Sequence, residues 1–508
     1  MRILIADAEI DFDAAAVRRA GRLQPLPEAA ARILRSLFDA EGAPVASTTL
    51  EAVIAGLQDR MQVGDAIGCL RELLGDGHDA ERLIGTAGTS GYRLKVPARA
   101  VDGRPDRARD PACLLMFPLR LIGGDRNDQL IADGVTDLIA GHLMQSENVR
   151  LLSRPTAEAA SGSDPDYAAL ENRTGVEFIT EGSLMHQPAG YRLRVRLVRA
   201  RHSSIIKTIQ ADSDASVGGL AEAARHISRM ILRHNGIAGS GLPDTSGETR
   251  SCPGYGSLAA FRWAAAARAS YRSGDIASAR ALLSEYAGVA CNSDDDPGVC
   301  ATASLLYLSL LRQAVFDDPH SISGKARRAA ARAVAADPAC ASGQAALAQC
   351  EALTGDREAC DASAQVAVSL APRDPVVLAE TGYAYALIGQ EAEAVSLLEK
   401  AVSLSMVHPA WYNYAKIWQY VRLGYADKAL GLLRAYPDPD SAWYLAQEVS
   451  ILGILGETEK AMVSHKKLKH MCRGSDGIIS AHLNHWQHNT ELTGLFLKGW
   501  QAAGLNRA

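Results

Sequence analysis

Two aspartates in the first half of the chain have a spacing that could support chemistry. Asp133 and Asp137 are four residues apart, so on a helix both carboxylates would lie on one face. Such a pair could bind a metal ion or act as an acid–base pair. The simpler interpretation is that one aspartate caps or pairs locally while the other is solvated. We favour the simpler interpretation for these two residues.

Three histidines near Cys472 form a second group. His482, His485 and His488 are spaced three apart, and on a helix such steps drift by about 60° over two intervals, so the outer pair converges poorly on a metal ion. A polar helix end is the preferred interpretation. The sequence contains no G-x-S-x-G, Walker or dinucleotide-binding motif, and Gly236–Gly241 lacks the strand-before, helix-after context of such a motif. We therefore expect no enzymatic activity, no catalytic residue, no metal site and no cofactor.

The composition is that of an ordinary globular protein with several domains. The chain has 508 residues, 47 % of them hydrophobic, and a net charge of −5, so no overall charge attracts nucleic acid. No apolar stretch approaches the ~18–20 residues of a membrane span, and acidic residues interrupt the N-terminal segment where a signal peptide would be apolar. Nine unpatterned cysteines are typical of reduced thiols. We expect a cytoplasmic protein.

One small pattern recurs five times in the C-terminal half. A glycine is followed by a polar turn and, five positions on, by a small residue. The five glycines are Gly274, Gly355, Gly389, Gly424 and Gly456. The steps between them are 81, 34, 35 and 32 residues, and a period near 34 indicates stacked helix–turn–helix units. The glycine would end the first helix of each unit. Residues 255–505 thus resemble the tetratricopeptide repeat (TPR) family, which implies a helical solenoid that binds protein segments.

The first helices of the last repeats are rich in aromatic and amide side chains. Trp411, Tyr414 and Trp418 would share one helical face, where packing alone could explain them. Other side chains would then point toward the concave groove of the array. The candidate groove residues are Asn413, Tyr420 and Gln447. Aromatic anchors with amide donors suit recognition of an extended or helical peptide.

Residues 1–96 are predicted to form four short strands, three helices and a hairpin. The helices are expected at about Pro27–Ala40, after Ser47 and at about Met61–Leu74, and the hairpin strands at Arg82–Thr86 and Tyr92–Val96. This order resembles the OmpR/PhoB-type winged helix. The residues that carry the resemblance are the segment Ala20–Pro27, Leu70–Gly75 in the third helix and Gly91–Leu94 in the wing.

The resemblance implies that the third helix lies in the major groove of DNA and that the wing contacts the backbone or minor groove. Cations on this face would neutralise phosphates and reach base edges. The candidate DNA-binding residues are Arg60, Arg71, Thr86, Arg93 and Lys95. The sequence departs from the family here, because residues 59–76 contain four acids and two bases. A winged helix that contacts protein instead of DNA is the alternative, and solvated surface charge is the simpler explanation of any one of these residues.

Residues 97–112 are predicted to be a linker, rich in arginine, aspartate and proline. Residues 113–235 alternate strands and helices and include three sequential antiparallel strands at about Val176–Leu184, Tyr191–Ala200 and Ser204–Ala211. This unit resembles the TolB amino-terminal/FlgO-like domain on the segments Phe117–Pro118, Ala132–Asp137, Leu151–Arg154, Gly175–Leu184 and Arg194–Leu197, which implies interactions rather than catalysis. Residues 236–254 are predicted to be a second linker.

Together these features predict a multidomain α+β protein: a winged helix-turn-helix, a small α/β domain and an α-helical TPR solenoid. The leading hypothesis is a bacterial one-component transcriptional regulator in signal transduction, which binds promoter double-stranded DNA and uses the α/β domain and the TPR array to sense or recruit a protein partner. A homodimer is also possible, because tandem half-sites favour paired winged helices. The alternative is a non-catalytic protein-interaction scaffold whose winged helix has lost DNA binding.

Overall fold

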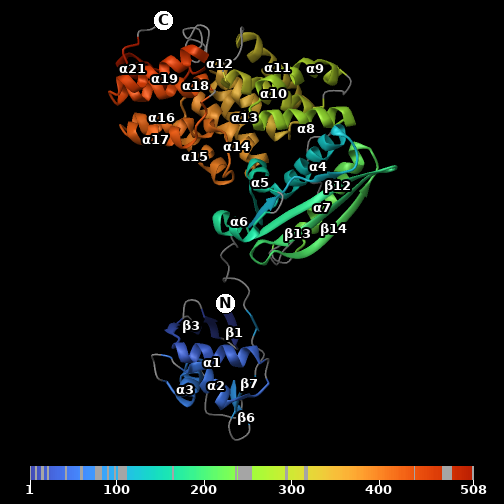
Figure 1. Ribbon diagram of the computed structural model, residues 1–508, viewed down its shortest axis with the longest axis vertical. Helices are drawn as coiled ribbons and strands as arrows, with labels where there is room; N and C mark the ends of the chain where they lie inside the picture. Colours follow the sequence, from blue (N-terminus) through green and yellow to red (C-terminus); the bar gives the residue numbers. More distant parts are fainter. Residues whose placement is uncertain are drawn as a thin grey trace. The chain divides into compact units, whose positions relative to one another are not determined.

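The computed structural model describes most of residues 2–505 and divides them into two compact units, Met1–Arg109 and Asp110–Ala508. Each unit is described by itself (Figure 1). The longer gaps in the description are 75–82, 101–110, 238–254, 292–295, 314–318 and 472–482. The shorter gaps are 6–7, 13–15, 20–21, 41–42, 56, 58–60, 88–90, 96–98, 163–164, 235–236 and 440.

The first unit begins with an antiparallel sheet, continues with three helices and ends in a hairpin. The strands β1 to β4 are Arg2–Ile5, Ala8–Asp11, Ala16–Arg19 and Arg22–Pro25. The helices α1, α2 and α3 are Glu28–Asp39, Ser47–Ile54 and Val63–Leu74. The later strands β5 to β8 are Val45–Ala46, Ile84–Ala87, Gly91–Leu94 and Arg99–Ala100. The order of elements is the expected one, apart from two short strands: β5, which lies between α1 and α2 and pairs with β7, and β8, which pairs with β1 inside the segment predicted to be a linker.

Two antiparallel sheets enclose the helices of this unit. The strand orders are β4-β3-β2-β1-β8 and β5-β7-β6. Helix α1 has a strongly amphipathic sequence, and its apolar residues Ile33, Leu34 and Leu37 are fully buried against the sheet and against Ile67 and Leu70 of α3. One core therefore holds the three helices and fixes which face of α3 is exposed.

The second unit begins with a mixed sheet between two helical layers. Its strands β9 to β14 are Ala112–Met116, Arg120–Ile122, Val149–Leu151, Phe178–Gln187, Gly190–Arg199 and Ser204–Ser213. Its helices α4 to α7 are Arg126–Met144, Arg154–Ala160, Tyr167–Thr174 and Val217–Leu232, with a 3₁₀ turn η1 at Ala200–His202. The strand order is β11-β9-β12-β13-β14, and β10 pairs with β12. The three sequential antiparallel strands are confirmed as β12, β13 and β14.

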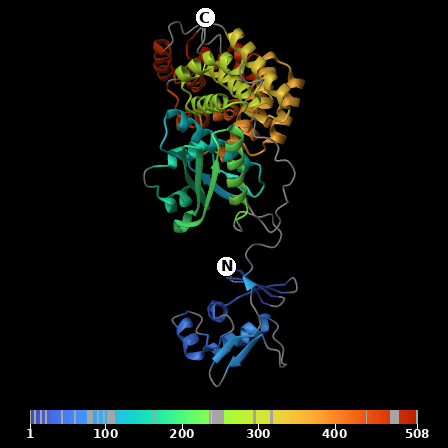
Figure 2. The ribbon, with the colours of Figure 1, turned by 90° about the vertical axis from the view of Figure 1, so that its right-hand side faces the viewer.

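Alternation along β13 separates the two faces of this sheet. Leu193, Val195 and Leu197 are buried with α4 and α7 on one face, whereas the arginines between them point away and are exposed or half-buried. Helices α5 and α6 cover part of the other face around Leu115 and Ile179. Figure 2 shows this layered arrangement from the side.

The rest of the second unit is an array of paired helices. The described helices α8 to α13 are Leu258–Ser273, Ile276–Cys291, Pro297–Gln313, Pro319–Ala336, Ala341–Thr354 and Arg357–Leu370. The helices α14 to α19 are Pro375–Leu387, Glu391–Ser403, Tyr414–Arg422, Ala426–Ala435, Ala442–Ile454 and Thr458–Met471, with a 3₁₀ turn η2 at Ala410–Asn413 before α16. A final helix, α21, is Thr490–Ala502. We call the first helix of each pair, α8, α10, α12, α14, α16 and α18, an A helix.

The five recurring glycines end the A helices as predicted. Each has a positive φ, between 69° at Gly274 and 81° at Gly424, a conformation that side chains with a Cβ adopt only at a cost. The small residue five positions on is buried in the following helix; Cys360 and Ala394, for example, are fully buried. Local backbone chemistry thus sets the period of the array.

The α/β layer and the array share one continuous interior. Phe261 of α8 belongs to the core of the α/β layer, and its ring lies where a Cβ on Gly134 of α4 would stand. Two hydrogen bonds to backbone carbonyls also cross the junction. Ser153 N–H donates to Leu404 O at 2.8 Å, and the Arg373 guanidinium donates to Ser146 O at 2.7 Å. Within the part of the chain that the structure describes, no helix combines the length and apolar character needed to cross a membrane.

Candidate functional site

The predicted DNA-binding residues that the structure describes fall into two groups. Arg71 on α3 is half-buried, and its Nη2 donates to Ile84 O of β6 at 2.9 Å, so this guanidinium ties the third helix to the hairpin. Thr86, Arg93 and Lys95 are exposed on or just after the hairpin strands. Arg60 lies outside the described residues.

The exposed face of α3 carries little that would attract a phosphate. Gly64, Asp65, Gly68 and Glu72 are exposed there, and a Cβ on either glycine would meet no heavy atom within 4 Å. Both charged side chains in this set are acidic. The exposed cations of the hairpin are therefore better placed for nucleic acid than the helix that the family resemblance assigns to the major groove.

Two of the three predicted groove residues are buried, which corrects their expected placement. Gln447 is 0 % exposed, and its Oε1 accepts from Trp418 Nε1 at 2.8 Å between α18 and α16. Asn413 is 6 % exposed, and its Nδ2 lies 3.0 Å from His408 Nε2. Tyr420 is half-buried under the ammonium of Lys416. Each amide is thus hydrogen-bonded to a neighbouring side chain of the array, Gln447 to Trp418 and Asn413 to His408. Further chain also covers part of the face that the sequence predicted to be open.

Residues 483–489 supply part of that cover. Trp486 is buried between two A helices: its ring is edge-on to Tyr383 of α14 and stacked on Trp443 of α18, with centroid distances of 5.2 and 6.3 Å. Asn489 Nδ2 donates to Ala386 O at 2.7 Å. His485 Nε2 lies 3.2 Å from the Tyr383 hydroxyl. The chain thus makes aromatic and hydrogen-bonded contacts with its own array.

A close approach extends this cover to an earlier helix pair. The imidazole of His488 lies against Gly355 at the end of α12, where an added Cβ would stand 2.5 Å from the ring. We define the A-helix face as the surface formed by Gly355, Tyr383, Ala386 and Trp443. It spans α12, α14 and α18, and residues 483–489 occupy it. His482, the third predicted histidine, lies outside the described residues.

A buried ion pair lies beneath this face. Arg312 of α10 and Glu380 of α14 are 5 % and 0 % exposed, and Nη2 lies 2.6 Å from the carboxylate. Gln349 and the Tyr271 hydroxyl also donate to Glu380, and the guanidinium stacks on Trp411 at 3.7 Å. Burial, together with neighbouring Arg312, lowers the pKa of His485 to about 3, so that imidazole is neutral.

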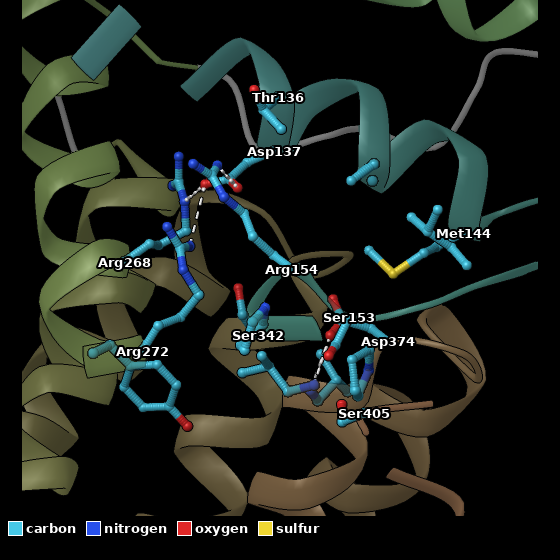
Figure 3. Close-up of a pocket in the computed structure, with 18 of the residues that line it drawn as sticks. Thr136, Asp137, Met144, Ser153, Arg154, Arg268, Arg272, Ser342, Asp374 and Ser405 are labelled. Carbon is cyan, nitrogen blue, oxygen red and sulfur yellow. Dashed lines mark hydrogen bonds and ion pairs between the residues drawn. The ribbon is translucent and has the colours of Figure 1, made fainter. Parts of the chain in front are cut away.

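A cavity of about 280 Å³ lies at the junction of the α/β layer and the array (Figure 3). One wall comes from α4 and the start of α5, and the other from α8, α10, α12, the start of α14 and residues 405–409. Apolar side chains, among them Met144, Leu305, Val377 and Val407, make up much of the lining. The cavity therefore lies between α4 of the α/β layer and the A helices of the array.

Three arginines converge on Asp137 at that edge. Arg154 Nη1 donates to Asp137 Oδ1 at 2.6 Å, and Arg268 Nε donates to Oδ2 at 2.7 Å. Arg272 lies farther away, at 3.7 Å from Oδ2. Burial alone would raise the pKa of Asp137, but the three guanidinium groups hold it well below its ordinary value. Asp133 also pairs with Arg154, at 2.6 Å. Both aspartates therefore form ion pairs with arginines distant in the sequence, whereas the sequence predicted that one of them would be solvated.

His408 lies on the opposite wall and is also neutral. Its Nδ1 donates to Ser405 O at 2.7 Å, which leaves Nε2 to accept from Asn413. Burial lowers the pKa of His408 below its ordinary value. Among the described residues no group of three histidine, cysteine or carboxylate side chains could hold a metal ion.

No family model and no curated protein shows a significant match to this sequence. Solved structures with partial similarity include a thermophilic TPR protein from Thermus thermophilus, at 20 % identity over 31 % of this chain and 81 % of that one, with a TM-score of 0.26. The APC/C heterotetramer Cut9–Hcn1 matches at 11 % identity over 48 % and 45 % of the two chains, with a TM-score of 0.34. The human IFIT1 dimer with m7Gppp-AAAA matches at 15 % identity over 77 % and 74 %, with a TM-score of 0.29. All three TM-scores are below 0.5, so these similarities assign the chain to no family.

Proposed function

We propose that the second unit is a non-catalytic protein-interaction scaffold whose A-helix face binds a short peptide segment. This proposal rests on the packing of residues 483–489, because four side chains of this short segment contact three A helices. They are His485, Trp486, His488 and Asn489. The A-helix face binds an aromatic ring, an imidazole and an amide of its own chain, and side chains of these kinds anchor peptides in the grooves of other proteins. A partner with a similar segment would compete for this face, and a second copy of the chain could supply one.

The proposal can be tested by weakening the internal segment and offering it again as a peptide. His485→Ala combined with Asn489→Ala removes the partners of the Tyr383 hydroxyl and of Ala386 O. A labelled peptide of residues 483–492 should then bind the variant at least tenfold more tightly than the wild type, because the tethered segment competes at roughly millimolar effective concentration. Fluorescence anisotropy measures the affinities.

Matched controls come from the same segment. Asn484 and Gln487 are exposed, so Asn484→Ala combined with Gln487→Ala should leave the face occupied and peptide binding weak. A peptide with Trp486→Ala should bind neither protein. If the first variant keeps its circular dichroism spectrum and still binds no peptide, the A-helix face is only an internal core and the scaffold proposal fails at this site.

Promoter binding by the first unit is the second candidate function. It would agree with the OmpR/PhoB-type and TolB-like resemblances and with a cytoplasmic regulator of transcription. The observation in its favour is the exposed pair Arg93 and Lys95 beside Thr86. Arg93→Ala with Lys95→Ala should reduce the log–log salt dependence of DNA binding by roughly 2, about one unit per phosphate contact. Arg35→Ala, an exposed arginine on α1, is the control; equal effects of both changes, or no salt-sensitive binding by the wild type, would exclude the hairpin as a DNA site.

A further inference from the structure

The cavity between the α/β layer and the array has the size and lining of a small-molecule site. Its volume of about 280 Å³ is close to the lower end of the range for such sites, roughly 300–1,000 Å³. Apolar side chains from both walls line much of it, including Met144 from α4 and Val377 from α14. A cavity of this kind favours a compact ligand with an apolar body.

One guanidinium at the edge of the cavity has unused hydrogen-bonding capacity. Arg154 donates through all three of its nitrogens to Asp133, Asp137 and Glu158. Arg268 donates to Asp137 and to the Tyr255 hydroxyl. Arg272 differs from both, because its shortest contacts with carboxylates of the described chain are 3.7 Å to Asp137 and 3.8 Å to Glu158, which are too long for hydrogen bonds.

The surroundings of Arg272 favour an anion. Its side chain is 14 % exposed, and burial, together with the nearby Arg154 and Arg268, lowers its pKa, although Asp137 and Glu158 oppose the shift. A largely buried guanidinium whose contacts with the nearby carboxylates are longer than hydrogen bonds gains from a ligand carboxylate, which can take two parallel N–H donors.

The carboxylates around the cavity favour a ligand with a single negative charge. Three arginines face three carboxylates at this edge: Arg154, Arg268, Arg272, Asp133, Asp137 and Glu158. Asp374 lines the cavity as well, capping α14 through Val376 N–H at 2.8 Å. A phosphate with its roughly two charges would meet these carboxylates, whereas a monoanion needs only Arg272.

We propose that this cavity binds a small apolar carboxylate, with the carboxylate on Arg272 and the apolar body along Met144, Leu305 and Val377. This inference goes beyond the scaffold function. The cavity shares no lining residue with the A-helix face as defined above, so either site can fail without the other.

Octanoate is a suitable probe, and octanamide is its uncharged counterpart of the same length. Isothermal titration calorimetry on the full chain should show saturable binding of octanoate. Octanamide should bind roughly tenfold to a hundredfold more weakly, the usual effect of losing a charge-assisted hydrogen bond. This comparison needs no variant, so folding defects do not affect it.

Two substitutions locate the site. Arg272→Gln should weaken octanoate by roughly tenfold to a hundredfold and leave octanamide nearly unchanged. Ala140→Leu fills space at the α4 wall and should weaken both probes. Arg357→Gln removes an exposed arginine at the start of α13 and serves as the charge-matched control, with no effect expected.

A photoreactive diazirine analogue of octanoate provides an independent readout. Mass spectrometry should find its labels in α4 or in residues 405–409, and excess octanoate should suppress them. Equal affinities for octanoate and octanamide, octanoate binding that survives both Arg272→Gln and Ala140→Leu, labels elsewhere on the chain, or no saturable binding at millimolar concentration would each overturn the assignment.

Discussion

The ion pair of Arg312 and Glu380 makes a sharp prediction about the stability of the array. Glu380→Gln keeps the shape of the side chain, but its single amide oxygen replaces two acceptors: Tyr271 donates to Oε1 of the carboxylate, whereas Arg312 and Gln349 donate to Oε2. The change removes the negative charge and one acceptor, so the guanidinium of Arg312, 5 % exposed, stays charged and loses its carboxylate partner. Breaking a buried pair in this way costs about 3–5 kcal/mol, whereas an exposed pair contributes roughly 0–1 kcal/mol.

A second substitution tests the cause. Arg312→Met added to Glu380→Gln removes the stranded cation and leaves a thioether over Trp411. The double variant should therefore regain at least about 1–2 kcal/mol of the unfolding free energy that Glu380→Gln loses. Two substitutions at independent sites would instead have additive effects. Glu399→Gln, which breaks the exposed pair with Lys416, is the control and should cost less than about 0.5 kcal/mol.

Urea unfolding followed by tryptophan fluorescence measures these changes. All six tryptophans lie within residues 255–505, so the signal reports the array and not the first unit. A loss below about 1 kcal/mol for Glu380→Gln, or a double variant less stable than the single one, would show that water reaches Arg312 and that the face above it is open.

Two further predictions concern residues 483–502. The folded-state pKa of His485 is about 3, below its ordinary value of 6.5, so its contribution to the free energy of unfolding is complete above pH 6.5 and is lost as the pH falls toward 3. Urea midpoints should show the wild type losing on the order of 1 kcal/mol of stability per pH unit in this range. His485→Gln should reduce this loss, and His470→Gln, at an exposed histidine, should leave it unchanged. Gly499→Ala places a Cβ 2.1 Å from Ser450 O where α21 crosses α18 and should cost about 1–3 kcal/mol or more. Gly494→Ala on the same helix meets no heavy atom within 4 Å and should gain about 0.5–1 kcal/mol; equal melting temperatures for the two glycine variants would contradict the close crossing.

The repeats could be predicted from sequence because their signal is local. A glycine such as Gly389 ends its helix through its own backbone conformation, and the small residue that follows packs within the same pair. The exposed face of a helix is not a local property. Gln447 has the sequence context of a groove residue, yet it is buried and accepts a hydrogen bond from Trp418 of α16. Residues 483–502 pack on the neighbouring Trp443 and Trp418.

The cavity could not be predicted for a related reason. Asp137 was recognisable as part of a pair, but its partner Arg268 lies 131 residues away, and no periodic signal links α4 with α8. In the sequence, Arg268 and Arg272 resemble any other arginines on an amphipathic helix. Only the packing of the α/β layer against the array brings them to one carboxylate and leaves the cavity beside them.

The fold-back of residues 483–502 also affects the order in which the array can be completed during synthesis. In most helical repeats each pair needs only its neighbours, so folding can follow the chain as it emerges. Here Tyr383 and Trp443 stay uncovered until Trp486 has been made, and the side of α18 that packs against α21 stays uncovered until α21 follows. The nascent array therefore exposes aromatic surface for the time needed to translate these last segments.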